Sequence, residues 1–349
     1  MNPTHTPPSL RLGMALLCAC AAAAADPGYY DDLETLFGPA DVSTATGNGR
    51  LTVCVNAYGR ITSCRWPSPG FHDQLDYRTR AFDAPLLGVE PDHGAMWGIR
   101  LGETTRWLTG PPWQSSQRWP LSVAPVIRTT SRIPDSSLTV TQSLLVNPRY
   151  DVLLAHIALA GAEPPPLLYW YANFAPCTRL VAELPIADWM LDQCNDFAVF
   201  AQPEPLTIYH FRPIAPGKDT WDRAQRLLRQ HAFAHQAASF GEGVWIALTS
   251  PHATGALQCG VPGESGSAYH QATDGPLEGK RAAVGRCNSV LALEPVAEKA
   301  GTSALVYIAF GHTKHEVDTI LERARQTSYD GHERAAILHW GAAVAPIAL

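Results

Sequence analysis

The sequence predicts a large antiparallel β-sandwich followed by a short helical tail. Along most of the 349 residues, short runs rich in β-branched and aromatic residues alternate with Pro, Gly and Asn, which is the pattern of strands joined by turns. Little between these runs has helical periodicity, so the helical crossovers of a parallel sheet are not expected. No repeat of fixed period is visible, which argues against a propeller or a solenoid.

The composition supports a packed globular domain and excludes some classes of partner. Hydrophobic residues make up 46% of the chain and charged residues 17%, which is enough apolar surface for a core and excludes wholesale disorder. The net charge is −6 and no block of Lys and Arg is present. Nucleic acid and anionic membrane surfaces attract clustered cations, so neither is expected as the main partner.

The first residues are typical of a secretory signal peptide. Arg11 precedes an apolar run over residues 12–25 that ends in small residues, and Asp26-Pro27-Gly28 follows. We expect cleavage after Ala25, so that residues 1–25 direct the protein to the periplasm or the exterior. The run is too short for a membrane helix. A lipoprotein is less favoured, because Leu17-Cys18-Ala19-Cys20 is a poor lipobox.

Removal of this leader leaves six of the eight cysteines. An even number in an exported chain favours disulfides, although sequence alone does not choose the pairing. The pairs that are local in the chain are Cys54–Cys64, Cys177–Cys194 and Cys259–Cys287. The first pair needs a three-residue loop over 58–60, because a two-residue turn would put the two thiols on opposite faces of the hairpin. Zinc is not expected, because no Cys-x-x-Cys spacing occurs.

The strands are expected in chain order, beginning with a hairpin. Residues 51–56 and 61–66 flank a turn at Gly59, with Val53 and Val55 alternating with more polar neighbours. Further runs of the same character predict strands over 137–145, 152–159, 167–172, 197–201, 206–211, 243–249, 289–293 and 304–310.

Three stretches have helical periodicity. Apolar residues recur at helical spacing over 219–237. The sequence Thr313-x-x-Glu316 is a capping box, and the apolar positions of the following residues predict a helix over 313–324. A last helix is expected over 333–344, around Trp340.

Several short motifs together resemble the N-terminal region of bacterial glucoamylase and glucodextranase chains. These motifs are Gly47-Asn48-Gly49, the hairpin that ends in Trp66-Pro67, Leu145-Val-Asn147-Pro148-Arg-Tyr-Asp151, Asp196-Phe-Ala-Val, Phe211-Arg212-Pro213 and Ala309-Phe310-Gly311-His312-Thr313. Each is weak alone, and their order and spacing carry the resemblance, which runs from about Thr46 to the end of the sequence.

The resemblance implies a galactose-mutarotase-like super-β-sandwich over residues 26–312 and a helical linker over 313–349. In that family the linker leads into an α/α barrel that carries the catalytic glutamates. No residue of this sequence corresponds to them, so the resemblance assigns no catalytic residue here. It implies an exported, non-catalytic domain of a glucoamylase-like glycoside hydrolase acting on α-glucans, with the barrel as partner. Calcium is suggested by the resemblance alone, since no Asp-x-Asp-x-Asp-Gly loop is present.

The residues themselves offer weak candidates for carbohydrate contact. Trp107 and Trp113 lie in a region rich in Pro and Gly, and Asp188-Trp189 lies between Cys177 and Cys194. Aromatic faces stack on sugar rings, but large aromatic residues more often pack in a core, which we favour for the tryptophans. Asp73 and Asp76 are expected in a solvated loop, and no spacing identifies an acid pair.

Thirteen histidines suggest metal binding or acid–base work, but their spacing supports neither. His231 and His235 are four residues apart on an expected helix without the Glu of a zinc protease motif, so partly buried positions on a helix face are expected. His156 and His210 are the nearest candidates for a mutarotase-like pair. No metal site is predicted.

Two functions therefore remain. The chain is either the sandwich and linker that support a catalytic barrel, or a stand-alone sandwich that binds or isomerises sugars. An open apolar face on the helix over residues 317–324 would indicate an absent partner, whereas a buried face would indicate a chain complete in itself.

Overall fold

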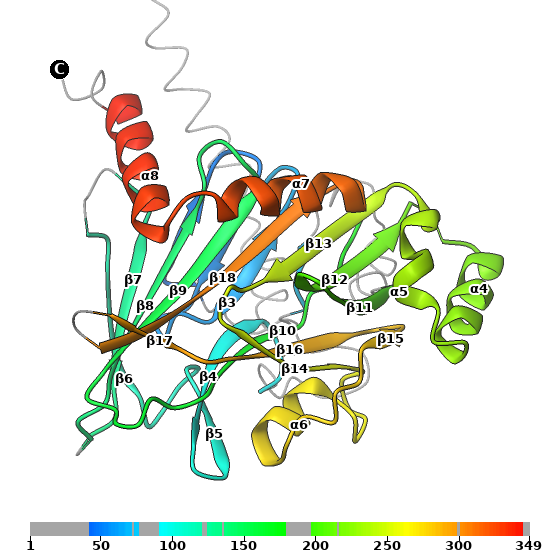
Figure 1. Ribbon diagram of the computed structural model, residues 1–349. Coiled ribbons are helices and arrows are strands. Elements are labelled where there is room, and N and C mark those ends of the chain that lie inside the picture. The colour runs from blue at the N-terminus through cyan, green and yellow to red at the C-terminus, as the bar shows by residue number, and fades with distance from the viewer. Residues whose placement is uncertain are drawn as a thin grey trace, which may run out of the picture. The chain divides into compact units, whose positions relative to one another are not determined.

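Two antiparallel sheets pack face to face in the computed structural model of the chain (Figure 1). Strands of alternating burial, such as β7 (Ile127–Arg132), point every second side chain into the space between the sheets. That space is filled by one large apolar cluster that includes Trp66, Trp97 and Trp170. The predicted antiparallel β-sandwich is thus confirmed.

The structure describes residues 42–71, 73–76, 91–120, 124–134, 136–178, 197–214, 216–298 and 301–344. All of them belong to one structural unit, and the second unit, residues 1–40 and 78–90, lies outside this part of the chain. The expected signal peptide therefore lies outside the described residues. None of the described helices is long and apolar enough to cross a bilayer.

The smaller sheet has eight strands within the described residues, in the spatial order β1-β2-β3-β4-β10-β16-β14, with β5 paired to β4. Most of these strands come from the first half of the described chain, and α6 (Ala268–Asp274) lies on the outer face. The strand bounds are β1 Thr44–Gly47, β2 Thr52–Val55, β3 Ile61–Arg65, β4 Ala95–Leu101, β5 Thr104–Trp107, β10 Leu168–Ala172, β14 Ala253–Gly260 and β16 Asn288–Leu293.

The larger sheet has ten strands within the described residues, in the order β15-β11-β12-β13-β18-β9-β8-β7-β6, with β17 paired to β18. At one edge lies the three-residue β15 and at the other the polar β6. The bounds of the remaining strands and of these two are β6 Gln114–Arg118, β8 Thr139–Val146, β9 Val152–Ala160, β11 Ala198–Pro203, β12 Leu206–Pro213, β13 Gly243–Thr249, β15 Ala282–Val284, β17 Val296–Glu298 and β18 Gly301–Gly311.

Helices cover the outer face of the larger sheet, because its central strands are apolar on both sides. Every residue of β13 is buried, and a second apolar cluster joins this face to the helices. These helices are α4 (Lys218–Arg229), α5 (Phe233–Gln236), the 3₁₀ turn η2 (Ala237–Phe240), α7 (Lys314–Arg325) and α8 (Tyr329–Val344).

Two of the predicted helices form largely as expected and one is interrupted. The capping box is present: the Glu316 backbone N–H donates to Thr313 Oγ1 at 3.1 Å, and Glu316 Oε2 accepts from the His312 N–H at 2.7 Å. The helix expected over 219–237 instead ends at Arg229 and resumes as α5, because His231 adopts a left-handed conformation with φ of 53°.

Two of the predicted disulfides are wrong. Cys54 lies opposite Ser63 and Cys64 opposite Val53, so the two thiols point to opposite faces of the hairpin. Among the described residues Cys259 and Cys287 are likewise not joined, although both are buried. Burial raises the pKa of the Cys259 thiol to about 12, which keeps it protonated and unreactive. Cys194 lies outside the described residues, so the pair with Cys177 stays a prediction.

Four of the motifs behind the family resemblance meet at one end of the sandwich. Asp151 Oδ2 accepts from Trp66 Nε1 at 2.8 Å, and Asn48 Nδ2 donates to Asp151 Oδ1 at 3.2 Å. The Asn48 amide also donates to the Asn147 carbonyl at 3.1 Å. The ring of Trp66 lies 4.6 Å from that of His312, just before α7. Segments far apart in sequence are thus fixed to one another where the helical tail begins.

We predict that Asp151→Ala lowers the free energy of unfolding by about 2–4 kcal/mol, because it leaves the buried Trp66 indole N–H without its acceptor and removes one of the acceptors of the Asn48 amide. Arg50→Ala is the matched control. Arg50 also pairs with Asp151, at 2.9 Å, but its side chain is 58% exposed, so we expect a loss below about 1 kcal/mol. Urea denaturation measures the free energy of unfolding of both variants. Equal losses would contradict the larger stabilising role given to the buried contacts of Asp151.

Candidate functional site

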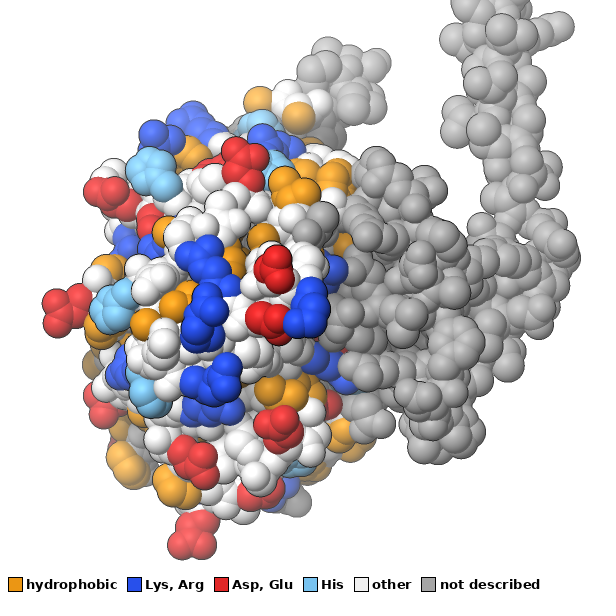
Figure 2. Space-filling view, turned by 90° about the vertical axis from the view of Figure 1, so that its right-hand side faces the viewer, with side chains coloured by type: hydrophobic (Ala, Val, Ile, Leu, Met, Phe, Trp, Pro, Cys, Tyr) orange, Lys and Arg blue, Asp and Glu red, His pale blue; other side chains and the backbone are white. Residues whose placement is uncertain are grey.

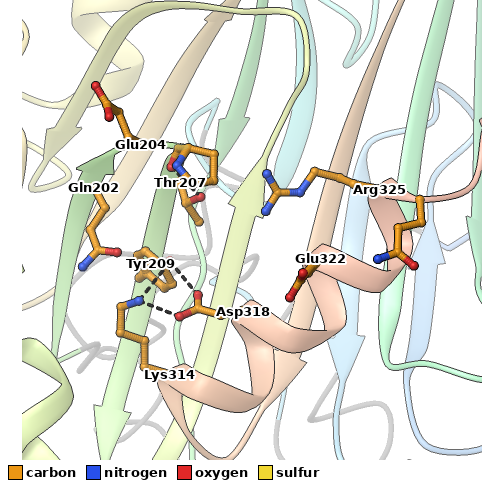
Figure 3. Close-up of a pocket in the computed structure, with 10 residues that line it drawn as sticks. Gln202, Glu204, Thr207, Tyr209, Lys314, Asp318, Glu322 and Arg325 are labelled. Carbon is orange, nitrogen blue, oxygen red and sulfur yellow. Dashed lines mark hydrogen bonds and ion pairs between the residues drawn. The ribbon is translucent and has the colours of Figure 1, made fainter.

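A polar pocket lies between the β11–β12 hairpin and α7 on the outer face of the larger sheet (Figure 3). Its volume is about 570 Å³. The hairpin supplies one wall, and successive turns of α7 supply the other because residues four apart share a helix face. The lining side chains are Gln202, Glu204, Pro205, Thr207, Tyr209, Lys314, Asp318, Glu322, Arg325 and Gln326.

Three of these side chains form a closed network at the base of the pocket (Figure 3). Tyr209 OH donates to Asp318 Oδ1 at 2.7 Å, and Lys314 Nζ lies 2.7 Å from Asp318 Oδ2. Lys314 Nζ also donates to the Tyr209 oxygen at 3.2 Å and sits over the ring. Burial and then the hydrogen bond to Asp318 raise the pKa of the Tyr209 phenol well above its usual value, so it stays a neutral donor.

This network anchors α7 on the sheet. The two oxygens of Asp318 are engaged by the Tyr209 phenol and by the Lys314 ammonium group. The other face of the Tyr209 ring stacks on Phe200 at 5.0 Å. The polar pocket therefore fixes the helix that follows the sandwich, and its mouth is lined by Glu204, Glu322 and Arg325 (Figure 3).

The apolar face of α7 is buried on the sheet. Val317, Leu321 and Ala324 are at most 1% exposed and belong to the cluster on the outer face of the larger sheet. An open face on this helix would have indicated an absent partner, and the structure provides no such indication.

Open apolar surface is found on α8 instead. This helix packs Ala336 on the sandwich but leaves Leu338 67% exposed. From Ala335 to Val344 it contains no Lys, Arg, Asp or Glu. In Figure 1 α8 stands at the end of β7 and β8 and projects beyond it. A helical segment without charged side chains, such as the part of α8 from Ala335 on, is typical of an element that is covered on several sides.

The tryptophans proposed for carbohydrate contact lie in packed surroundings. Trp107 is 8% exposed, stacks on Tyr269 at 5.1 Å and donates from Nε1 to Thr273 Oγ1 at 2.8 Å. Trp113 is 3% exposed. Almost none of either ring is open to a sugar, so this geometry gives their predicted contact no support. Asp188 and Trp189 lie outside the described residues, and their contact stays a prediction.

The structure does not bring the candidate histidines together into a site. His210 lies between the sheets, where its Nε2 is 2.8 Å from Ser289 Oγ. His156 lies on the outer face, stacked on Tyr329 at 4.5 Å. His231 and His235 are both exposed, so their expected burial on a helix face is wrong. No group of three or more metal-ligating side chains occurs among the described residues.

A buried ion pair was missed by the sequence analysis. Asp76 is 5% exposed rather than solvated, and its Oδ2 accepts from Arg286 Nε at 2.6 Å. Nearby, Arg60 Nε donates to the His93 carbonyl at 2.8 Å. The partners Asp76 and Arg286 are 210 residues apart, so no local pattern could have predicted this contact.

Comparison with known proteins shows the fold. No sequence profile of a known family matches the chain, and no curated protein is similar to it in sequence. A bacterial glucoamylase solved with acarbose is similar in structure, with a TM-score of 0.55 and 9% identity over 86% of this chain and 36% of that one. A putative kojibiose phosphorylase from the human microbiome gives a TM-score of 0.50 and 9% identity over 86% and 35%.

The chain thus spans about a third of the length of these two carbohydrate-active proteins. At this identity the comparison shows the sandwich fold, in agreement with the fold class predicted from the sequence. The motif resemblance and the structural similarity agree on this fold.

We predict that the fold loses stability in acid partly through His210. Burial lowers the pKa of His210 from its usual value of 6.5 to about 3. The unfolded chain therefore binds a proton that the folded chain excludes, and the free energy of unfolding falls as the pH drops from 6.5 toward 3, by at most about 1.4 kcal/mol per pH unit for one group.

Urea denaturation of His210→Asn between pH 7 and pH 4 measures this contribution. The variant should show a shallower loss of stability toward low pH than the wild type. The exposed His315→Asn is the control and should leave the slope unchanged. Equal slopes for the His210 variant and the wild type would show that the folded protein accommodates the charged ring.

Proposed function

We propose that this chain is the non-catalytic N-terminal sandwich domain of an exported carbohydrate-active enzyme of the glucoamylase or disaccharide phosphorylase kind, and that it supports a catalytic α/α-barrel domain. The observation that carries the proposal is the shared fold with two such proteins over 86% of this chain but only about a third of theirs. The barrel lies on the same polypeptide or on a separate subunit.

The surface of α8 supports this assignment. Apolar area at the end of a helix stabilises a protein only when another surface covers it. Leu338 and the uncharged residues around it offer such an area, directly after the helix α7 that the polar pocket anchors. A barrel that follows α8 in the chain or docks on it would cover this apolar area. Because the polar pocket holds α7 in place, the orientation of the barrel would be fixed through α7.

Three aspartates of the described residues are already engaged by cations. Asp76 is paired with Arg286, Asp151 with Arg50, and Asp318 with Lys314. A glycosidase needs one carboxyl group to deliver a proton and a second to act as base or nucleophile on the opposite side of the sugar. Carboxylates already engaged by cations are poor candidates for either role.

The alternative, a sandwich that binds or isomerises sugars alone, is less well supported. Trp107 and Trp113 are buried, and His156 and His210 lie on different faces of the larger sheet. An isomerase of this kind would need its acid and base to converge on one sugar.

We predict that the purified chain releases no glucose from maltose, starch or dextran, because its role is to support a barrel that carries the chemistry. A coupled glucose assay against a buffer control measures this, with a bacterial glucoamylase as positive control. Release of glucose above the buffer control by a folded sample would overturn the non-catalytic assignment.

We further predict that the native protein, isolated with an antibody against residues 42–344, carries an α/α-barrel on the same polypeptide or as a stoichiometric partner. A native species no larger than the 37.8 kDa of the 349 residues, without a barrel partner, would contradict the proposal. Leu338→Lys should weaken association with that barrel at least tenfold or, in a continuous chain, make the two domains unfold in separate transitions, since it places a charge in the apolar contact.

Ile214→Lys is the matched control for this variant. Ile214 is 62% exposed, close to the 67% of Leu338, but lies beyond the end of β12 and not on α8. It should leave association and unfolding unchanged.

A further inference from the structure

A second cavity among the described residues lies beside the β11–β12 hairpin, next to α4 and α5. It is a cleft of about 870 Å³ between α4–α5 and the segment that leads into β15. Its walls are mainly apolar, with Leu228, Phe233, Ala201 and Ala282 among the lining residues. Small-molecule sites are usually pockets of about 300–1,000 Å³ with mainly apolar walls, so the volume and the lining of this cleft are typical of such a site.

Two of the three charged side chains that line the cleft are basic, Lys280 and Arg281, and Glu204 is the acidic one. The imidazoles of His231 and His235 line the side formed by the helices. Figure 2 looks onto this side of the domain and shows several Lys and Arg side chains near the middle of the face, with Asp and Glu side chains beside them. On a chain of net charge −6, such a local excess of positive charge attracts anions.

The backbone that carries the two permanent cations is held in place. The Lys280 carbonyl accepts from the Cys259 N–H at 2.7 Å, and the Arg281 carbonyl accepts from the Ala201 N–H at 2.8 Å. Lys280 N–H donates to Gln258 Oε1 at 3.1 Å. Across the cleft, Gln202 Nε2 donates to the Ala234 carbonyl at 3.3 Å and ties the hairpin to α5. A site with fixed walls loses less freedom on binding.

His231 is held in a conformation that costs energy. Its φ of 53° is the only positive value at a non-glycine residue of the described chain. The His231 N–H donates to the Leu228 carbonyl and the Ala232 N–H to the Leu227 carbonyl, which is the helix ending that normally takes Gly. This helix ending places the His231 imidazole on the wall of the cleft.

We propose that this cleft binds a small organic anion with a flat apolar body, namely a phosphate or carboxylate carried on a ring. The ring would lie against Leu228 and the neighbouring apolar wall. Lys280, Arg281 and His231 would surround the anionic group, since charge-assisted hydrogen bonds to phosphate and carboxylate are stronger than neutral ones. The site is independent of the barrel proposed above.

Isothermal titration calorimetry of the full chain with phenyl phosphate tests this site. Phenylacetate, inorganic phosphate and neutral phenyl β-glucoside are the comparison ligands. Phenyl phosphate or phenylacetate should bind at least tenfold more tightly than both inorganic phosphate and the glucoside, because only these two combine an anion with a ring. The tighter of the two identifies the preferred anionic group. Absence of binding by both to a folded sample would overturn the proposal.

Variants locate the binding. Lys280→Ala/Arg281→Ala should weaken the better ligand at least tenfold. The control Arg118→Ala/Arg132→Ala removes the same charge from exposed positions on β6 and β7, at the opposite end of the larger sheet, and should change affinity less than twofold. Equal losses in the two double variants would show attraction by net charge alone and would overturn the site.

His231→Gly separates a binding role from a structural one. Glycine suits the left-handed position, so the midpoint of thermal unfolding should be unchanged or higher. Affinity for the better ligand should nevertheless fall several-fold. Unchanged affinity in this variant, together with unchanged affinity in Lys280→Ala/Arg281→Ala, would exclude the cleft as the binding site.

Discussion

The larger sheet is apolar on both faces, and most of the remaining structure follows from this constraint. Its central strands β13 and β18 bury nearly every side chain, so neither face can meet water without a large loss of hydrophobic stabilisation. The smaller sheet covers one face. The helices α4 and α5, which follow β12, and the helix α7, which follows β18, cover the other face. These helices are therefore part of the packed domain.

The same constraint explains how much of the fold could be predicted from the sequence. Strands buried on both faces, such as β13 and β18, form continuous apolar runs that are easily recognised. The helix α7 was predicted by its capping box, a local motif. The strand β6, Gln-Ser-Ser-Gln-Arg, was missed because it lies at an edge and contains no apolar residue.

Features that depend on register or on distant contacts could not be predicted in this way. The predicted disulfide between Cys54 and Cys64 is wrong because an irregularity in the hairpin determines which residues lie opposite each other. The helix expected over 219–237 was interrupted at His231, whose left-handed conformation no spacing reveals. The polar pocket combines the β11–β12 hairpin with α7, about 100 residues later, so its Tyr209–Asp318 contact follows only from the folded sheet.

The two edges of the larger sheet bear on how the domain avoids aggregation. An exposed edge strand offers unpaired backbone groups to a neighbouring chain, and natural sheets limit this with short or polar edges. One edge here is β15, with three residues, and the other is β6, which has polar side chains throughout and ends in Arg118. Strand addition between copies is therefore disfavoured at both edges. The described edges of the larger sheet therefore offer a second copy of the domain little backbone to pair with.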